Sequence, residues 1–306
     1  MTQPIVPEPA TPAVQDAGYG SPRRGATARV LTTLGVLLGV VAVGFGALFL
    51  VDLAMSETTT SHHTYDAVGT VELVTDGDVT VTAAEGDVEV DAVAHSGLRE
   101  PRYSAEESGD RLEVTHRCGW SVFLPRCSGD LDVTLPAGTE VVVRTENGDV
   151  VAGGLAGEVT LHTSNGEVEA TDVAGSLFAR SSNGDVTVTG AGSDVEVSSS
   201  NGDLTVRDVD GTVTGGTSNG RVTVEEVTGD ASVRSSNGSV EVSGVGGDVD
   251  AQTSNGDVTV TGDDEPVALT IETSNGRETI DGPTDPDADR TVRIRSSNGD
   301  VTYLVP

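Results

Sequence analysis

Apolar and polar residues follow a fixed pattern that repeats through the second half of the chain. The dipeptide Asn-Gly marks each unit; the first six intervals between its copies are 18 residues, and the last two are 20 and 23. Counting each Asn as the first place, apolar residues occupy the fourth, sixth and thirteenth places, and Ser or Thr occupies the seventeenth. Short period-2 runs between turn residues predict two strands per unit. The nine asparagines are Asn147, Asn165, Asn183, Asn201, Asn219, Asn237, Asn255, Asn275 and Asn298.

Two arrangements fit this repeat. Asn-Gly is a common hairpin turn, so a meander of hairpins would place the apolar positions on one face of a sheet. Such a sheet needs a second layer to cover it, and no helical period appears after Asp52. A β-solenoid removes the difficulty, because each 18-residue coil encloses a thin core between its own two strands. We therefore expect an all-β, parallel β-helix-like solenoid, right-handed, with positive φ angles at the Asn-Gly corners.

The pattern also predicts boundaries. Residues 66–306 are expected to form one β-strand-repeat domain, with regular repeats over 145–280. Residues 97–144 break the period and contain both cysteines and three prolines, so we expect an irregular capping segment at one end of the rod. We expect a C-terminal cap over residues 281–306, and a polar linker over residues 52–65.

One uncharged stretch precedes this domain. Residues 30–51 contain no charge, and as a helix they would span roughly 33 Å, about the thickness of the hydrocarbon layer of a membrane. Three arginines lie before the stretch and acidic residues follow it, which predicts a cytoplasmic N-terminus and an extracellular repeat domain. A cleavable signal peptide is the alternative, but its apolar region would be shorter. Residues 1–29 are proline-rich with little apolar material, so we expect a disordered cytoplasmic tail.

The charge is strongly negative. The chain has 49 acidic and 17 basic residues, for a net charge of −32. A field of this sign repels nucleic acid, so we expect no nucleic-acid partner. Acidic residues follow several of the Asn-Gly pairs, which raises calcium as a ligand, but the glycine-rich nonapeptide of calcium-binding β-rolls is absent. We expect no metal and no cofactor.

Cys118 and Cys127 are the two cysteines of the chain. In an oxidising compartment outside the cytoplasm we expect them to form a disulfide. The intervening loop includes Trp120 and Phe123 and is the most apolar segment outside the membrane stretch. These aromatic residues are candidates for contact with a partner, and the alternative is a plug over the end of the solenoid.

Several segments together resemble a known family. They are residues 98–103, which read LREPRY, the two cysteines, residues 135–141, which read LPAGTEV, and the repeated Ser-Asn-Gly-Asp-Val. With the apolar stretch, they resemble the actinobacterial members of the "putative adhesin" β-strand-repeat family, a domain of unknown function. The resemblance implies a β-solenoid at the cell envelope, and it supplies no catalytic residues.

No nucleophile, metal or acid–base motif stands out from the repeats. The five histidines lie outside any such motif, and acidic pairs are too common here to indicate glycoside cleavage. We therefore expect a non-catalytic, membrane-anchored module that binds an envelope polymer or a surface protein. An extracytoplasmic sensor or scaffold that acts through the single helix is the alternative, and a polysaccharide-active enzyme is a more remote one.

Overall fold

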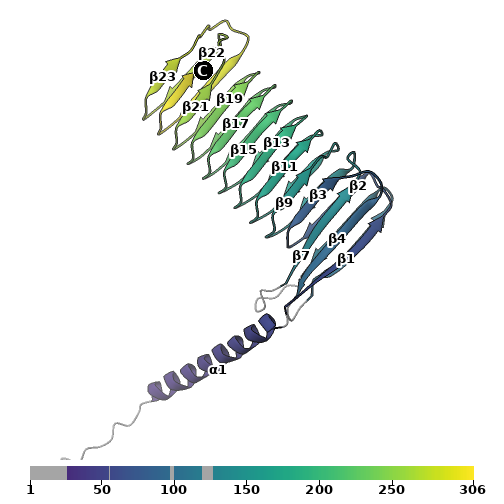
Figure 1. Ribbon diagram of the computed structural model, residues 1–306. Helices are drawn as coiled ribbons and strands as arrows, with labels where there is room; N and C mark the ends of the chain where they lie inside the picture. Colours follow the sequence, from purple (N-terminus) through teal and green to yellow (C-terminus); the bar gives the residue numbers. More distant parts are fainter. Residues whose placement is uncertain (1–25, 55, 97–99, 119–126) are drawn as a thin grey trace, which may run out of the picture. The chain divides into compact units, whose positions relative to one another are not determined.

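The computed structural model describes residues 26–54, 56–96, 100–118 and 127–306, and it divides into two units, residues 1–50 and 51–306 (Figure 1). One helix, α1 (Ala26–Ala54), dominates the first unit. Its window Leu34–Val51 has a mean hydropathy of 2.6 and no buried residue, so the helix is long and apolar enough to be a membrane anchor or a signal sequence.

The helix is longer than the predicted 30–51. It begins at Ala26, inside the predicted tail 1–29. The nearest proline before the helix is Pro22, and residues 26–54 contain no proline that would interrupt it. The rest of that predicted tail, residues 1–25, lies outside the described residues.

The second unit consists of two sheets that face each other, with strands stacked as rungs (Figure 1). The first sheet contains, in spatial order, β1 (Glu57–Tyr65), β4 (Val88–Ser96), β7 (Cys127–Leu135), β3 (Val79–Ala83), β9 (Val150–Gly153), β11 (Val168–Val173), β13 (Val186–Ala191), β15 (Leu204–Val209), β17 (Val222–Val227), β19 (Val240–Val245), β21 (Val258–Thr261), β25 (Val301–Leu304) and β23 (Glu278–Asp281). The second contains β5 (Arg102–Ser108), β6 (Arg111–Arg117), β2 (Thr70–Thr75), β8 (Glu140–Arg144), β10 (Val159–His162), β12 (Leu177–Arg180), β14 (Val195–Ser198), β16 (Val213–Thr217), β18 (Ala231–Ser235), β20 (Val249–Thr253), β24 (Thr291–Ser296) and β22 (Ala268–Thr273).

Through the repeats, each strand pairs in parallel with the equivalent strand one unit later. Val168 of β11 lies beside Val186 of β13, and Leu177 of β12 lies beside Val195 of β14. Equivalent side chains are therefore stacked about 4.8 Å apart. The solenoid prediction is confirmed and the hairpin meander is wrong for the repeats; the handedness stays a prediction.

The core between the sheets is filled by Val, Leu and Ala. The predicted fourth, sixth and thirteenth places are buried, as in Val186, Val188 and Val195. The ninth and fifteenth places are buried as well, for example Val209 and Val233. Burying each such side chain contributes roughly 1.5–3 kcal/mol, so a narrow core of small residues stabilises the rod through its length.

The glycines of the Asn-Gly corners are required for a different reason than the one we predicted. Their φ angles are not positive. Instead, a Cβ on Gly184 would overlap the carbonyl of Gly166 in the preceding coil, and the same overlap recurs along the column. Glycine is needed there because neighbouring backbones approach closely.

Positive φ angles occur at the eighth place of every unit from Gly154 to Gly244. The residues are Gly154, Asp172, Gly190, Asp208, Glu226 and Gly244. A left-handed residue here interrupts the period of two, so that the ninth place turns into the core after the sixth.

The C-terminal end of the rod is built out of chain order. The last two strands, β24 and β25, lie between the coil of β20 and β21 and the coil of β22 and β23. The predicted C-terminal cap over 281–306 is therefore wrong, because residues 291–304 form an interior coil. Residues 268–281 form the end of the rod, and all of them except Asp281 lie in the span predicted as regular repeats, 145–280.

The other end shows the same kind of insertion. The coil of β2 and β3 lies between the coil of β6 and β7 and the coil of β8 and β9. Antiparallel partners then close both sheets: β5 pairs with β6, and β4 joins β7 to β1. Such strands cover edges that would otherwise remain open.

Two boundary predictions are wrong at this end. The segment 97–144 is not irregular, since most of its described residues belong to β5, β6, β7 and β8. The 18-residue period is lost here, but alternating apolar residues such as Leu112 and Val114 are still buried on one face of these strands. Residues 52–65 are not a polar linker, and the domain starts before residue 66. They contain the end of α1 and strand β1, whose polar residues Glu57–Tyr65 pair along the whole of β4.

Candidate binding surface

The asparagines of the repeat form a continuous ladder. The side-chain amide of Asn165 donates to the side-chain oxygen of Asn147 at 2.9 Å, and to the carbonyl of Glu146 at 3.0 Å. The same two donations recur in each later coil, through Asn298 and Asn275 at the end. The amides therefore hold successive coils together.

The buried hydroxyls of the seventeenth place also join coils. Thr163 donates to the carbonyl of Gly148 at 2.9 Å and accepts from the backbone N–H of Gly166 at 3.1 Å. Ser181 makes the equivalent bonds with Gly166 and Gly184. Each hydroxyl thus satisfies a buried donor and a buried acceptor, which explains why this core place is never purely apolar.

The acidic residues after Asn-Gly accept hydrogen bonds from backbone groups. Asp149 accepts from the N–H of Glu167 at 2.8 Å, and Asp185 accepts from the N–H of Asp203 at 2.7 Å. On another column Asp194 accepts from the N–H and hydroxyl of Thr212, which lowers the pKa of its carboxyl. These carboxylates therefore serve coil stacking, and within the described residues no group of three or more His, Cys, Asp or Glu is placed to hold a metal ion.

The disulfide between Cys118 and Cys127 is confirmed, and its two Cα atoms are 5.9 Å apart. It links the end of β6 to the start of β7. Cys127 pairs with Ser96, which in turn pairs with Glu57 at the start of β1. Trp120 and Phe123 lie outside the described residues, so their contact with a partner stays a prediction.

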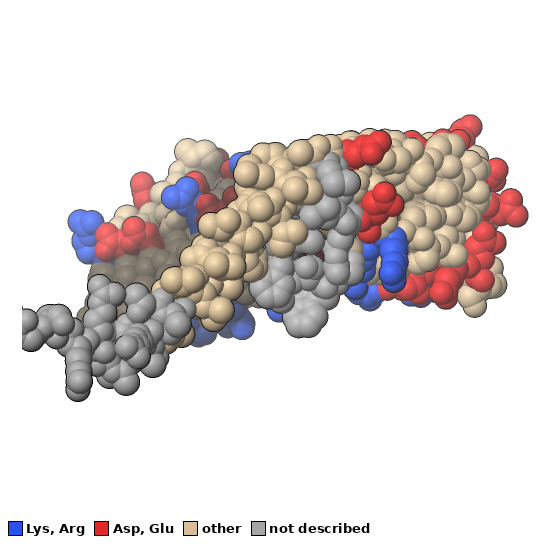
Figure 2. All heavy atoms as spheres, turned by 90° about the horizontal axis from the view of Figure 1, so that it is seen from below, with Lys and Arg blue, Asp and Glu red and all other residues tan. Residues whose placement is uncertain are grey.

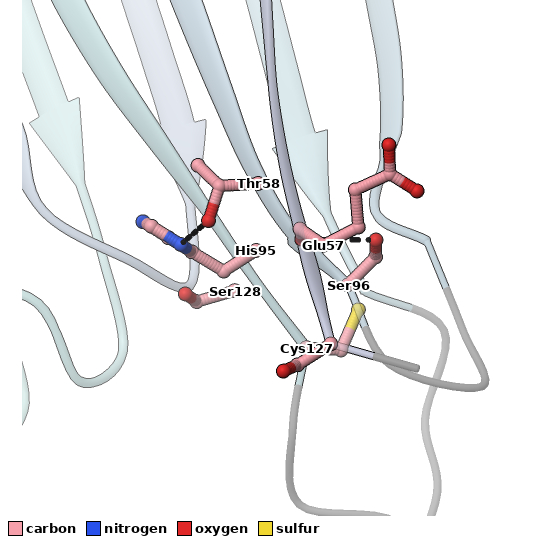
Figure 3. A pocket seen from close by; sticks show the side chains of 7 residues that line it. Glu57, Thr58, His95, Ser96, Cys127 and Ser128 are labelled. Carbon is pink, nitrogen blue, oxygen red and sulfur yellow. Dashed lines mark hydrogen bonds between the residues drawn. The ribbon is translucent and has the colours of Figure 1, made fainter. Parts of the chain in front are cut away.

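A shallow hollow of about 320 Å³ lies beside Cys127 (Figure 3). His95 lines the hollow with its ring beside Thr58, and its Nδ1 lies 3.2 Å from the Thr58 hydroxyl (Figure 3). Its Nε2 lies 2.9 Å from a carboxylate oxygen of Asp130. Both ring nitrogens are engaged between strands, and Ser96 donates to the carbonyl of Glu57. These side chains hold β1 against the sheet and do not form a reactive pair.

Aromatic rings gather nearby. The ring of His63 stacks on Tyr103 with centroids 4.2 Å apart, and the hydroxyls of Tyr103 and Tyr65 lie 2.7 Å apart. Burial, followed by this hydrogen bond, raises the pKa of Tyr103. His116 is almost fully buried, its Nδ1 donates to the carbonyl of Asp130 at 3.3 Å, and burial lowers its pKa. The cluster packs the end of the rod.

One strip differs from the acidic columns. On the outer face of the second sheet, Arg144, His162 and Arg180 occupy the same place in three successive coils. Acidic and basic side chains are both exposed on the face of the molecule in Figure 2, and the chain as a whole has 49 acidic and 17 basic residues. Burial, then the charges of Arg180 and Arg144, lower the pKa of His162. Sequence reasoning missed this strip, although the 18-residue spacing of these three residues could have shown it.

Phe178 lies beside this strip. It precedes Arg180 by two residues on β12, so both side chains leave the same face of the sheet, and Phe178 is half-buried. It borders a hollow of about 320 Å³. The hollow is also lined by Glu158, Ser176, Asp194, Glu196 and Thr214.

The second unit is thus a two-sheet β-solenoid whose repeated polar side chains are largely engaged in stacking. The family model described as Toastrack DUF4097 matches residues 70–305. The chain belongs to this family, a domain of unknown function.

Solved structures of similar fold include a "putative adhesin" from Bacteroides fragilis, at 12% identity and a TM-score of 0.45, with 81% of this chain and 97% of that chain covered. Another is a "putative adhesin" from Parabacteroides merdae, at 10% identity and a TM-score of 0.31, covering 81% and 96%. A "Putative lipid binding protein" from Parabacteroides distasonis has 10% identity and a TM-score of 0.34, covering 80% and 96%. No curated protein matches this chain.

Proposed function

We propose that this chain is a non-catalytic, adhesin-like binding module of the cell envelope, anchored in the membrane by α1. Its N-terminus lies in the cytoplasm and its repeat domain lies outside the cell. The partner is an envelope polymer or a surface protein, and the acidic surface repels nucleic acid.

The observation that carries this proposal is that the repeated polar side chains form hydrogen bonds between neighbouring coils. Asn165, Thr163 and Asp149 represent three columns whose members bond to the next coil. Catalysis needs a nucleophile or acid–base group that is free to reach a substrate. These columns have instead the regularity of a rigid rod, which suits the display of a long surface.

The proposed orientation in the membrane is supported by the charges beside the apolar stretch and by the disulfide. Arg23, Arg24 and Arg29 precede the uncharged stretch 30–51, as the positive-inside rule requires for a cytoplasmic N-terminus. The disulfide between Cys118 and Cys127 is typical of an oxidising compartment.

The test uses the full chain in lipid nanodiscs, incubated with cell walls isolated from its source cells and then sedimented. We expect the protein to sediment with the walls and to show no release of reducing ends from them. A chain that stays in the supernatant with walls and with intact cells would contradict the binding function, and released reducing ends would contradict its non-catalytic character.

A further inference from the structure

The strip of Arg144, His162 and Arg180 brings two arginines and a histidine together on an acidic rod. Strand pairing places His162 beside Arg144 on one side and beside Arg180 on the other. Neighbouring members are therefore about 4.8 Å apart along the rod. Burial lowers the pKa of His162, and the nearby charges of Arg180 and Arg144 lower it further.

The members of the strip differ in their engagement. Arg144 and Arg111 both contact Glu72, whose side chain is largely buried between them. The side chain of Arg180 is exposed, and its guanidinium makes no ion pair or hydrogen bond with any of the residues that the structure describes. By contrast, Arg207 forms an ion pair at 2.6 Å with Glu225, which lies in the next coil after that of Arg207. Arg180 therefore has all its donors available for an anion.

Phe178 adds an apolar ring to the same face. In register, Phe178 has Thr160 on one side and Glu196 on the other, while Arg180 has His162 and Ser198. The hollow beside the ring is lined by the carboxylates of Glu158, Asp194 and Glu196 and by the hydroxyls of Ser176 and Thr214. An aromatic ring flanked by carboxylates and hydroxyls suits a sugar, because the ring packs on its apolar face and the oxygens bond to its hydroxyl groups.

We propose that this face binds an acidic saccharide. One sugar ring lies on Phe178, with its hydroxyls toward the hollow, and its carboxylate is held by Arg180 next to His162. This inference deepens the proposed binding function and rests on it, since it assigns the envelope polymer to a glycan that carries carboxylate groups.

The surrounding charges limit the spacing of anions on the ligand. The carboxylates of Glu158, Asp194 and Glu196 border the hollow, and at physiological salt the field of a charge extends over about 8 Å. A polymer with an anion on every unit would place some of them against these carboxylates. In a glycan with a carboxylate on alternate sugars, the acidic sugar would lie on Phe178 with its carboxylate on Arg180. The next sugar along the glycan, which is neutral, would then lie beside the carboxylates of the hollow.

The experiment measures binding of a hyaluronan oligosaccharide, which carries one carboxylate per disaccharide, to the full chain in nanodiscs by calorimetry. The neutral ligand control is the same oligosaccharide with its carboxylates reduced to alcohols, and inorganic phosphate tests simple anion binding. We expect binding of the acidic oligosaccharide, at least about tenfold weaker binding of the reduced form, and a rise in the pKa of His162 on binding.

Three variants locate the site. Arg180→Gln and Phe178→Ala are each expected to weaken binding about tenfold, whereas Arg234→Gln is expected to change it less than about twofold. Arg234 is a matched control because it is exposed and occupies the same place of the repeat on β18, with Ser232 where β12 has Phe178. Amide spectra of each variant check that the fold is retained.

Four results would overturn the site: no binding of the acidic oligosaccharide, equal binding of the reduced form, binding of phosphate alone with the same affinity, or equal losses in all three variants. The wall sedimentation assay separates the two proposals. Wild-type and Arg180→Gln protein that sediment equally would overturn this site and leave the binding function standing. Wild-type protein that binds the oligosaccharide through Phe178 but never sediments would overturn the wall-binding function alone.

Discussion

The side-chain amide of Asn298 donates to Asn255, 43 residues earlier, at 2.9 Å. Asn275 lies nearer in sequence, yet it stands on the far side of Asn298 and donates to it at 2.9 Å. The last coil of the chain is thus held between two others. Residues 268–281 depend on it, because their strands β22 and β23 pair with β24 and β25.

The corner glycines are expected to be the least tolerant positions of the rod. Gly184→Ala would place a Cβ against the backbone of Gly166, so the coils must separate or bend. We expect a loss of about 3 kcal/mol or more in the free energy of unfolding by urea denaturation. Gly138→Ala is the control, because nothing lies within 4 Å of its added Cβ, and it should cost less than about 0.5 kcal/mol. Equal stability of the two variants would refute close stacking at the corner.

Thr163 is expected to contribute through its hydroxyl rather than its shape. Thr163→Val keeps the volume but leaves the carbonyl of Gly148 and the N–H of Gly166 without this partner. We expect a loss of about 2–3 kcal/mol in the free energy of unfolding, while Thr163→Ser should lose under about 1 kcal/mol. If Val were as stable as Ser at this place, the hydroxyl bridge would have no energetic role.

Replacing a larger residue that has a positive φ at the eighth place by glycine should stabilise the fold. Glu226 has a φ of 56°. Glu226→Gly removes that strain, and after the entropy of glycine in the unfolded chain is subtracted we expect a gain of about 0.5 kcal/mol. The same change at Glu241, an exposed residue within β19, should instead cost about 0.5–1 kcal/mol. Opposite signs in thermal or urea denaturation support the assignment, and a loss at both sites argues against it.

The pKa of His162 depends on the charges of the strip of Arg144, His162 and Arg180. Burial and the charges of Arg180 and Arg144 lower its pKa, so Arg180→Gln should raise this pKa toward 6.5 in an NMR titration of the ring. Between the lowered pKa and 6.5 the unfolded chain binds more protons, so His162 makes the fold less stable as pH falls through this window. The variant should weaken that dependence. An unchanged pKa in Arg180→Gln, or the same rise in Arg234→Gln, would mean that the strip is not a local field.

The period of the sequence was enough to predict the stack, since the apolar places of one unit must lie on those of the next. The same period predicts contacts such as Arg207 with Glu225, which are 18 residues apart. The ninth place was missed although it is apolar in each regular unit, because it breaks the period of two: Val209 enters the core only after the left-handed turn at Asp208. The period also could not predict the spatial order of the strands at the ends of the rod. The intervals of 20 and 23 residues show that the last units contain extra residues, but only the strand pairing shows which coil lies between which others.

Spin-label distances test the stack and its inverted end most directly. Labels on outward residues at the same place of the repeat, Thr187 with Thr302 and Thr187 with Thr279, are separated by five and six rungs in the sheet order. We predict backbone distances of about 24 Å and about 29 Å, so that the residue later in sequence is the nearer one. A longer distance to Thr302 than to Thr279, or values near twice those predicted, as a meander of hairpins would give, would contradict the account.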